Sequence, residues 1–397
     1  PPALRASTPP PDPSMPAPLR VREIPPGEPL RPFVDLAWKA NAGDPAWVPP
    51  LRMVVEQLLD RRRHPFHRHA EVAYFLAERG GEPVGRVAAV ENRQYDEYHG
   101  GRTGFFGLFE CLDDPEAARA LLEAASAWLR ARGMERLVGP MNLSTNDELS
   151  SPGVLVEGFD TPPAVMMSHN PPYYARLLEG AGLAKEKDLV AYWMASPEPP
   201  ARAVAAMQRL AGRMGARIRS VRMRDLKEEV RRVQEVYNAA WSQNWGFVPM
   251  TPAEFEHMAK ELRPVVDPDI VFLAEKEDGE PIGFCLCLPD LNRALRHLPD
   301  GRLFPFGIFR FLWHRRRIDS LRVLTLGLKP GYQHLGLGAA MYVHAFRVAA
   351  AKGYRSGEGS WILEDNLEMR GAMEKMGATA YKTYRVYAAP LGAGAGG

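Results

Sequence analysis

Residues 321 to 353 read LRVLTLGLKPGYQHLGLGAAMYVHAFRVAAAKG, and this stretch decides the fold. The apolar run from Leu321 to Leu328 stops at Lys329-Pro330-Gly331, which predicts a buried strand with an abrupt end. Alanine and large apolar residues from Leu335 to Lys352 then predict a helix, which Gly353 closes at its C-terminus. The stretch therefore predicts a strand, a glycine-bearing turn and a helix in immediate succession.

The turn itself, residues 333–338, suits an anion. The first turn of a helix has unpaired backbone N–H groups and the positive end of the helix macrodipole. Glycine at 336 and 338 lets a phosphate come within hydrogen-bonding distance of the backbone. A P-loop would need Gly-Lys-Ser/Thr here, and a dinucleotide fold would need G-x-G-x-x-G with a later acidic residue; neither pattern is present. A packing role for the two glycines remains the alternative to diphosphate binding.

The pattern Gln-x-x-Gly-x-Gly at 333–338 resembles the acetyl-CoA pyrophosphate loop of the GCN5-related N-acetyltransferase (GNAT) superfamily. Downstream, a strand at 359–363, a short helix opened by Asn366 and a last strand at 381–387 follow the order of the C-terminal half of that fold. The resemblance implies acetyl-CoA, or another acyl-CoA, as co-substrate and no metal. The residues that it assigns to the coenzyme are Leu326, Leu328, Gln333, His334, Leu335, Gly336, Leu337, Gly338, Ala339 and Asn366.

The chain also repeats itself. Residues 271–275 (VFLAE) and 281–284 (PIGF) predict a hairpin, and residues 74–78 (YFLAE) and 81–85 (GEPVG) read almost alike. At 397 residues the chain exceeds the usual limit of one core, so two domains are expected on length alone. We predict an α/β protein of two tandem GNAT-like repeats, each a mixed, mostly antiparallel twisted sheet flanked by helices.

The two repeats differ at the helix that follows the fourth strand. In the first repeat this helix begins with Asp114 as N-cap and Pro115 at the first helical position, among several other carboxylates. These charges satisfy the helix dipole and would repel a diphosphate. The predicted organisation is therefore a disordered proline-rich tail (1–18), a degenerate GNAT-like domain without a CoA loop (19–198), a GNAT domain that binds acyl-CoA (199–390) and a flexible tail (391–397).

Composition sets the remaining expectations. The net charge of +2 argues against a nucleic-acid partner, and no apolar run approaches the ~18 residues of a membrane span. Three cysteines do not indicate a disulfide framework, and Cys285 and Cys287 are expected to pack in the core. We expect a cytoplasmic protein without a membrane partner, and leave its oligomeric state open. The clusters Arg61-Arg62-Arg63 with His64, His67 and His69, and Arg315-Arg316-Arg317, are predicted to be solvated surface.

An aromatic and polar stretch at 237–247 lies between the first two predicted helices of the second repeat, where the GNAT resemblance places the acceptor site. Trp241, Asn244 and Trp245 are its candidate substrate-binding residues, because aromatic faces with a few amides suit a small polar substrate. An equally good reading is that these aromatics cap the core.

Catalytic residues are harder to assign. Relatives use a carboxylate, or a water bound to one, as base and a tyrosine near the position of Met373 as acid, and this sequence has no tyrosine there. Glu358 and Glu364, which flank the fifth strand, are the candidate bases. Tyr381, Tyr384 or Tyr387 on the last strand could replace the missing acid, and we take Tyr384 as the candidate. A surface carboxylate or a packed tyrosine is the alternative for each.

The sequence thus predicts an N-acetyltransferase or a related acyltransferase. It would move an acetyl or other acyl group from acyl-CoA to a primary amine, on a small molecule or a peptide, by direct attack in a ternary complex. Two alternatives stay open: a non-catalytic acyl-CoA-binding module, and a tRNA-dependent aminoacyl transferase of the same tandem architecture.

Overall fold

The protein is described here from a computed structural model. The structure describes residues 17–146, 152–196, 201, 202, 204, 205, 209, 215–242, 244–333 and 336–392. Most of the predicted proline-rich tail, His334, Leu335 and the last five residues lie outside these ranges. Leu391, at the start of the predicted flexible tail, is buried, and its amide donates to the carbonyl of Glu135 at 2.8 Å.

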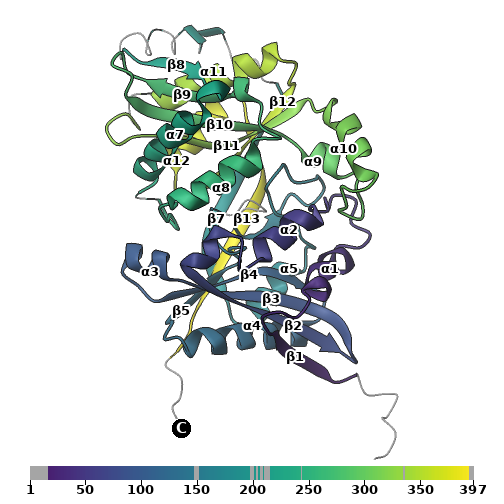
Figure 1. The fold of residues 1–397 in the computed structure, drawn as a ribbon. Coiled ribbons are helices and arrows are strands. Elements are labelled where there is room, and N and C mark those ends of the chain that lie inside the picture. The colour runs from purple at the N-terminus through teal and green to yellow at the C-terminus, as the bar shows by residue number, and fades with distance from the viewer. Residues whose placement is uncertain are drawn as a thin grey trace, which may run out of the picture.

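The first half follows the order that the repeat predicts (Figure 1). Its strands are β1 (Leu19–Ile24), β2 (Ala70–Arg79), β3 (Glu82–Asn92), β4 (Thr103–Cys111), β5 (Arg136–Gly139), β6 (Val154–Glu157) and β7 (Ala184–Met194). Its helices are α1 (Arg31–Ala40), α2 (Arg52–Leu59), α3 (Arg93–His99), α4 (Pro115–Arg130) and α5 (Tyr174–Gly180), with a 3-10 turn η1 (Pro65–Arg68).

The second half repeats this plan with one insertion. Its strands are β8 (Arg217–Ser220), β9 (Val271–Glu275), β10 (Pro281–Pro289), β11 (Ser320–Leu328), β12 (Ser356–Leu363) and β13 (Thr379–Pro390). Its helices are α7 (Leu226–Ala240), α8 (Pro252–Leu262), α9 (Asn292–Leu295), α10 (Gly307–Arg315), α11 (Leu337–Ala351) and α12 (Leu367–Lys375), with 3-10 turns η2 (Met223–Asp225) and η3 (Pro268–Ile270). The insertion is the segment of α9 and α10, where the first half has only α3.

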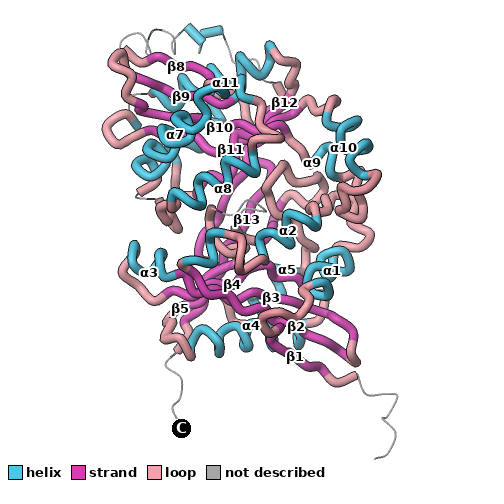
Figure 2. Tube along the Cα trace, viewed as in Figure 1, coloured by secondary structure: helices cyan, strands magenta, loops and turns pink. Residues whose placement is uncertain are grey.

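The two halves share one sheet and exchange their last strands. Over the described residues the sheet has 13 strands in the order β1-β2-β3-β4-β5-β13-β7-β12-β11-β10-β9-β8, with β6 paired to β13. The last strand of the second half, β13, pairs with β5 of the first, and the last strand of the first half, β7, pairs with β12 of the second. Figure 2 shows the strands continuing through both lobes. The sheet is mixed and mostly antiparallel, as predicted.

Each half has one parallel pair of strands that separates part way along. In the second half, β11 and β12 pair from Ser320–Ser356 to Val323–Gly359 and diverge beyond that point. In the first half, β4 and β5 pair from Thr103–Arg136 to Phe105–Val138. Each divergence leaves a wedge in the sheet, and these wedges hold the cavities described below.

Apolar clusters fill both faces of the sheet. Cys285 and Cys287 are buried in the second-half core, as predicted. The prediction that His64, His67 and His69 are solvated is wrong, because all three are half-buried where η1 meets α8 of the other half. His69 Nε2 lies 2.8 Å from a carboxylate oxygen of Glu254 on α8. A distant helix covers these side chains, which a local sequence pattern does not reveal.

Candidate active site

The start of α11 is open to an anion, whereas the start of α4 is not. Gly336 is the N-cap of α11 in the left-handed conformation (φ 76°), with no side-chain cap and no acidic residue in the first turn. At α4, the side chain of Asp114 accepts a hydrogen bond from the amide of Ala117 at 3.0 Å. Arg79 pairs with both Asp114 and Glu116, at 2.9 and 2.8 Å. The helix start of the first half is already satisfied by its own side chains.

Besides Gly336 and Gly338, five of the residues assigned to the coenzyme lie around this helix start and Asn366 lies at the start of α12, while His334 and Leu335 are outside the described residues. A Cβ added to Gly338 would meet Leu326 and Leu328 of β11 at 3.6 Å, so both leucines lie directly beneath the turn. Leu337 is fully buried at the helix start and Ala339 follows in its first turn, while Gln333 Nε2 lies 3.4 Å from the carbonyls of Ala240 and Leu328. Asn366 caps α12 by accepting from the amide of Met369 at 3.1 Å.

A β-bulge lies next to the separation of β11 and β12. Val323 and Thr325 of β11 pair with the consecutive residues Cys287 and Leu286 of β10, so Leu324 is the extra residue. A bulge re-aims the backbone where it occurs and is common beside active sites. Among the described residues, no side chain accepts a hydrogen bond from the amide of Leu324. The bulge therefore gives β11 an irregular stretch of backbone close to the point where the wedge opens.

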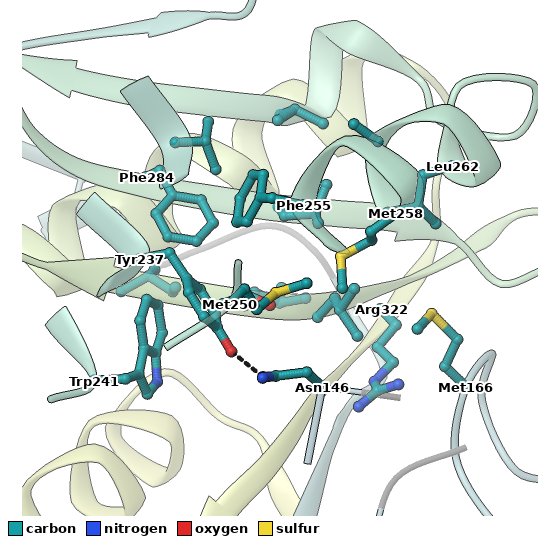
Figure 3. A pocket seen from close by; sticks show the side chains of 18 of the residues that line it. Asn146, Met166, Tyr237, Trp241, Met250, Phe255, Met258, Leu262, Phe284 and Arg322 are labelled. Atoms are coloured by element: carbon teal, nitrogen blue, oxygen red, sulfur yellow. Dashed lines mark hydrogen bonds between the residues drawn. The ribbon is translucent and has the colours of Figure 1, made fainter. Parts of the chain in front are cut away.

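The wedge opens into an apolar cavity of about 290 Å³, which we call cavity 1. One wall is the separated ends of β11 and β12 with Asn366 and Met369, and the other consists of α7 and α8. Figure 3 shows the phenylalanine rings of Phe255 and Phe284 on its wall, and the hydroxyl of Tyr237 hydrogen-bonded to the side-chain amide of Asn146 from the first half. Burial raises the pKa of Tyr237 above its usual range, so this phenol stays neutral.

The three candidate acceptor residues, Trp241, Asn244 and Trp245, all line cavity 1. A Cβ at Gly327 would come within 2.1 Å of the Trp241 ring, so Trp241 packs directly on the backbone of β11. Trp245 also packs against the core between the halves. These residues therefore both line the cavity and cover the core, and the two readings of the sequence are compatible.

Glu358 lies beneath the cavity in a buried polar cluster. Its side chain is 0% exposed and lies 3.7 Å from the guanidinium of Arg322. It accepts hydrogen bonds from the hydroxyls of Ser360 and Tyr381. Ser360 and Arg322 line cavity 1, and Arg322 Nε donates to Ser360 Oγ at 2.8 Å. Among the described residues, Glu358 contacts the cavity lining through Ser360 and through Arg322.

The other two catalytic candidates lie away from the cavity lining. Glu364 follows β12 at the surface, where it pairs with Lys185 at 2.6 Å and accepts from the amide of Asp188 at 3.0 Å. Burial raises the pKa of Glu364, but the hydrogen bond from Lys185 and the other favourable contacts lower it more, so the pKa lies below its ordinary value. Tyr384 is fully buried on β13, and its hydroxyl has no hydrogen-bond partner among the described residues. Burial raises the pKa of Tyr384 well above its usual range.

A second apolar cavity of about 290 Å³, cavity 2, lies at the wedge of the first half. It is bounded by Leu108 to Glu110 of β4, by α1 and the loop before α2, and by Leu291 and Leu295 at α9. The imidazole of His169, whose side chain is 2% exposed, also lines it and lies 2.8 Å from Asp44. Burial lowers the pKa of His169. Cavities 1 and 2 share two wall residues, Met166 and Leu262.

Met166 is held at this junction by the second half of the molecule. Its backbone is left-handed (φ 60°), an unusual conformation for a residue with a side chain. The amide of Val165 donates to Asp290 at 2.9 Å, and Arg322 donates to the carbonyl of Val165 at 2.7 Å. In the view of Figure 3, Met166 and Arg322 stand near each other at one end of cavity 1.

Sequence reasoning missed three features of this site: the bulge at Leu324, Arg322 and the loop of Met166. The alternation of apolar residues in β11 gives no sign of a bulge. Arg322 is a charged residue within an apolar strand, a signal that would have marked it as paired or functional. Nothing local marks Met166, because partners far along the chain fix its position.

Comparison with known proteins agrees with this geometry. The family model described as "Acetyltransferase (GNAT) family" matches residues 230–378. The "bacterial ceramide synthase" of Caulobacter vibrioides is 40% identical over 367 residues, which cover 90% of this chain and 94% of that protein. "Protein YghO" of Escherichia coli is 35% identical over 366 residues, covering 90% of this chain and 92% of that protein.

Among solved structures, a tandem GNAT protein from the clavulanic acid biosynthesis pathway matches with a TM-score of 0.55 at 12% identity, over 94% of this chain and 99% of that one. The GCN5-related glucosamine N-acetyltransferase region of a fungal multi-domain β-N-acetylglucosaminidase matches at 0.59 and 13% identity, over 95% of this chain and 38% of that one. The fold is that of tandem GNAT proteins. The chain belongs to the GNAT acetyltransferase family.

Proposed function

We propose that this protein transfers a long acyl chain from acyl-CoA to the primary amine of a second long-chain molecule. The observation that supports the proposal is the pair of apolar cavities that share two wall residues, Met166 and Leu262. One hydrocarbon chain in each cavity would bring the amine and the thioester together at the junction. A ceramide is an amide of a long-chain amine with a fatty acid, so the name of the Caulobacter relative supports the same chemistry.

The coenzyme fits the start of α11. Gly336 and Gly338 leave the backbone amides of the first turn accessible, and no carboxylate in that turn repels a diphosphate. The pantetheine arm would then pass between β11 and β12, because these strands separate beyond Val323 and Gly359. The Leu324 amide would donate to the thioester carbonyl and stabilise the oxyanion that forms when the amine attacks.

The attacking amine must lose a proton. Of the three predicted catalytic residues, Glu358 is the one with a hydrogen bond to a cavity-lining side chain among the described residues, since the hydroxyl of Ser360 donates to it. We therefore retain Glu358 as the base, acting through Ser360. Glu364 and Tyr384 do not line cavity 1, and their catalytic roles remain predictions.

Matched donors and acceptors test the proposal. Purified protein is given acetyl-CoA or palmitoyl-CoA with a short or a long primary alkyl amine, and both thiol release and the amide product are measured. We expect turnover with the long donor and the long amine, because each buried methylene contributes about 0.8 kcal/mol. Equal turnover with acetyl-CoA and a short amine would contradict the proposal. CoA binding without turnover on any pair would favour a non-catalytic acyl-CoA-binding module. Aminoacyl transfer from charged tRNA would favour a tRNA-dependent aminoacyl transferase.

Two variants that each place a large side chain in one cavity test the role of each cavity separately. Val233 lines only cavity 1 and Leu295 only cavity 2. Val233→Trp and Leu295→Trp should each shorten the chain accepted by one substrate and leave the other unchanged. Overpacking costs about 1–3 kcal/mol of stability, so each variant is compared with wild type by thermal melting first. If both variants shorten the same substrate, the assignment of one chain to each cavity is wrong.

A further inference from the structure

The insertion between β10 and β11 carries an unusual surface. In the described part of the chain, nine large hydrophobic side chains are exposed, and five of them lie between residues 304 and 313. Phe306 is 78% exposed, Phe309 70% and Trp313 58%. Their spacing of three and four residues places all three along one face at α10. Phe304 and Leu312 extend this face, which we call the α10 face.

The same segment is strongly basic. Residues 302–318 contain five arginines and no acidic residue. Arg316 and Arg317 are exposed at the end of α10, and the guanidinium of Arg317 lies 4.7 Å from the centroid of the Trp313 ring. Within the described residues, no carboxylate lies within ion-pair distance of Arg302, Arg310, Arg315, Arg316 or Arg317. Their charge is therefore available to an external anion.

The α10 face lies on the outside of the molecule, where an external partner can reach it. Figure 1 shows α10 at the edge of the second lobe, away from the sheet. The helix is anchored from within by Phe311, which packs with Leu298 and Leu291 in a small core. Met53, another exposed apolar residue, lines a surface hollow together with Phe304. Charged residues of the first half, among them Glu28, Glu56 and Asp60, line the same hollow.

We propose that the α10 face binds the surface of an anionic lipid bilayer. Its aromatic side chains would enter the boundary between headgroups and acyl chains, and the arginines would contact lipid phosphates. Exposed aromatic side chains beside arginines that have no ion-pair partner among the described residues are complementary to the anionic headgroups of such a bilayer. No helix in the described part of the chain is long and apolar enough to cross a membrane. The expectation of no membrane partner considered only such spans, and surface docking does not require one.

The α10 face has a functional consequence that rests on the proposed acyl transfer. Leu291 and Leu295, at the base of the insertion, line cavity 2. A long-chain substrate drawn from the bilayer would have a short path from the docked surface to this cavity. Vesicle binding itself requires no turnover, so it tests the docking surface even if the proposed reaction is wrong.

The test is flotation of the full chain with vesicles of neutral phosphatidylcholine alone or mixed with anionic phosphatidylglycerol. We expect binding to the mixed vesicles, weakened by added salt. The triple variant F306S/F309S/W313S and the charge variant R310E/R316E/R317E should each reduce binding by ~10-fold or more. Leu367→Ser, which removes a 73% exposed leucine on α12, is the matched control and should bind as wild type does.

Three outcomes would overturn the proposal. Equal binding to neutral and anionic vesicles would remove the role of the arginines. Unchanged binding of both variants would place the contact elsewhere. A wild type that is dimeric by light scattering and does not float, with a monomeric F306S/F309S/W313S variant, would make the α10 face an interface between two copies of this chain. Thermal melting of each variant confirms that loss of binding is not loss of fold.

Discussion

The two halves have the same wedge in the sheet, but the polar backbone groups beside it are bonded to side chains in the first half and not in the second, among the described residues. In both halves a bulge lies where the parallel strands separate: Leu108 and Phe109 of β4 oppose a single residue of β3, and Leu324 is the extra residue of β11. In the first half, the amide of Leu108 donates to the side chain of Asn142 at 3.0 Å. In the second half no described side chain takes that role.

The helix starts differ in the same sense. Asp114, Glu116 and Arg79 satisfy the start of α4 from within the chain, whereas the start of α11 has neither a side-chain cap nor a charge. Polar groups that are already paired gain little from a ligand, because binding must first break the internal hydrogen bond. Ligand binding is therefore expected in the half whose polar groups are left for an external partner.

The largest effect is expected from closing the open helix start. Gly338→Leu would place a branched side chain over Leu326 and Leu328, in the space of the diphosphate, and should abolish CoA binding by calorimetry. Gly180→Leu on α5 of the first half, where an added Cβ meets nothing within 4 Å, is the matched control and should leave CoA binding unchanged. Unchanged affinity of the Gly338 variant would remove this turn from the site.

The next effect concerns the buried Arg–Glu pair that each half contains. Glu358→Gln removes the carboxylate that lies beside the buried guanidinium of Arg322 and should lower the free energy of unfolding by about 3–5 kcal/mol, measured in urea. Glu110→Gln, in the first-half pair with Arg86, should cost less because the Glu110 side chain is 16% exposed and that of Glu358 0%. If Glu358 is also the base, kcat falls by ~10²- to 10⁴-fold only in its variant. Unchanged kcat would leave Glu358 a structural residue.

The third strands of the two halves, β3 and β10, are followed or ended by different residues, and stability should depend on pH at one of them. Asp290 follows β10, and burial, with the nearby charge of Glu358, raises its pKa from 3.8 to about 6. The unfolded chain loses this proton first as the pH rises, so the free energy of unfolding should fall by up to ~3 kcal/mol between about pH 4 and about pH 6. Asp290→Asn imitates the neutral Asn92 at the end of β3 and should flatten this part of the stability profile. A profile identical to that of wild type would assign the pH dependence to another group.

The smallest effect tests the closed bulge. Asn142→Gly removes the acceptor for the buried Leu108 amide and tolerates the left-handed backbone at this position (φ 47°). We expect a loss of ~1–3 kcal/mol in the free energy of unfolding and no new CoA binding in the first half. Asn142→Asp keeps an acceptor oxygen and should lose less. A variant as stable as wild type would show that the Asn142 hydrogen bond does not stabilise the closed wedge.

The sequence by itself determined the duplicated architecture and the location of the open helix start. Apolar periodicity, glycine at 336 and 338, and acidic residues at 114 and 116 are local signals, and each sets backbone geometry or charge within a few residues. The contrast between α4 and α11 therefore follows from the order of the amino acids alone. Trp241, Asn244 and Trp245 were also predicted from a local pattern, and all three line cavity 1; that they bind substrate stays a prediction.

Only the tertiary structure decided how the halves join and what the site contains. The exchange of β7 and β13 depends on pairing between strands nearly two hundred residues apart in sequence, and no local pattern encodes such a partner. The burial of His69 against Glu254 and the fixing of the Met166 loop by Asp290 and Arg322 have the same origin. Residues of both halves line the cavities. The size of the cavities and the residues they share therefore depend on how segments far apart in the chain pack together.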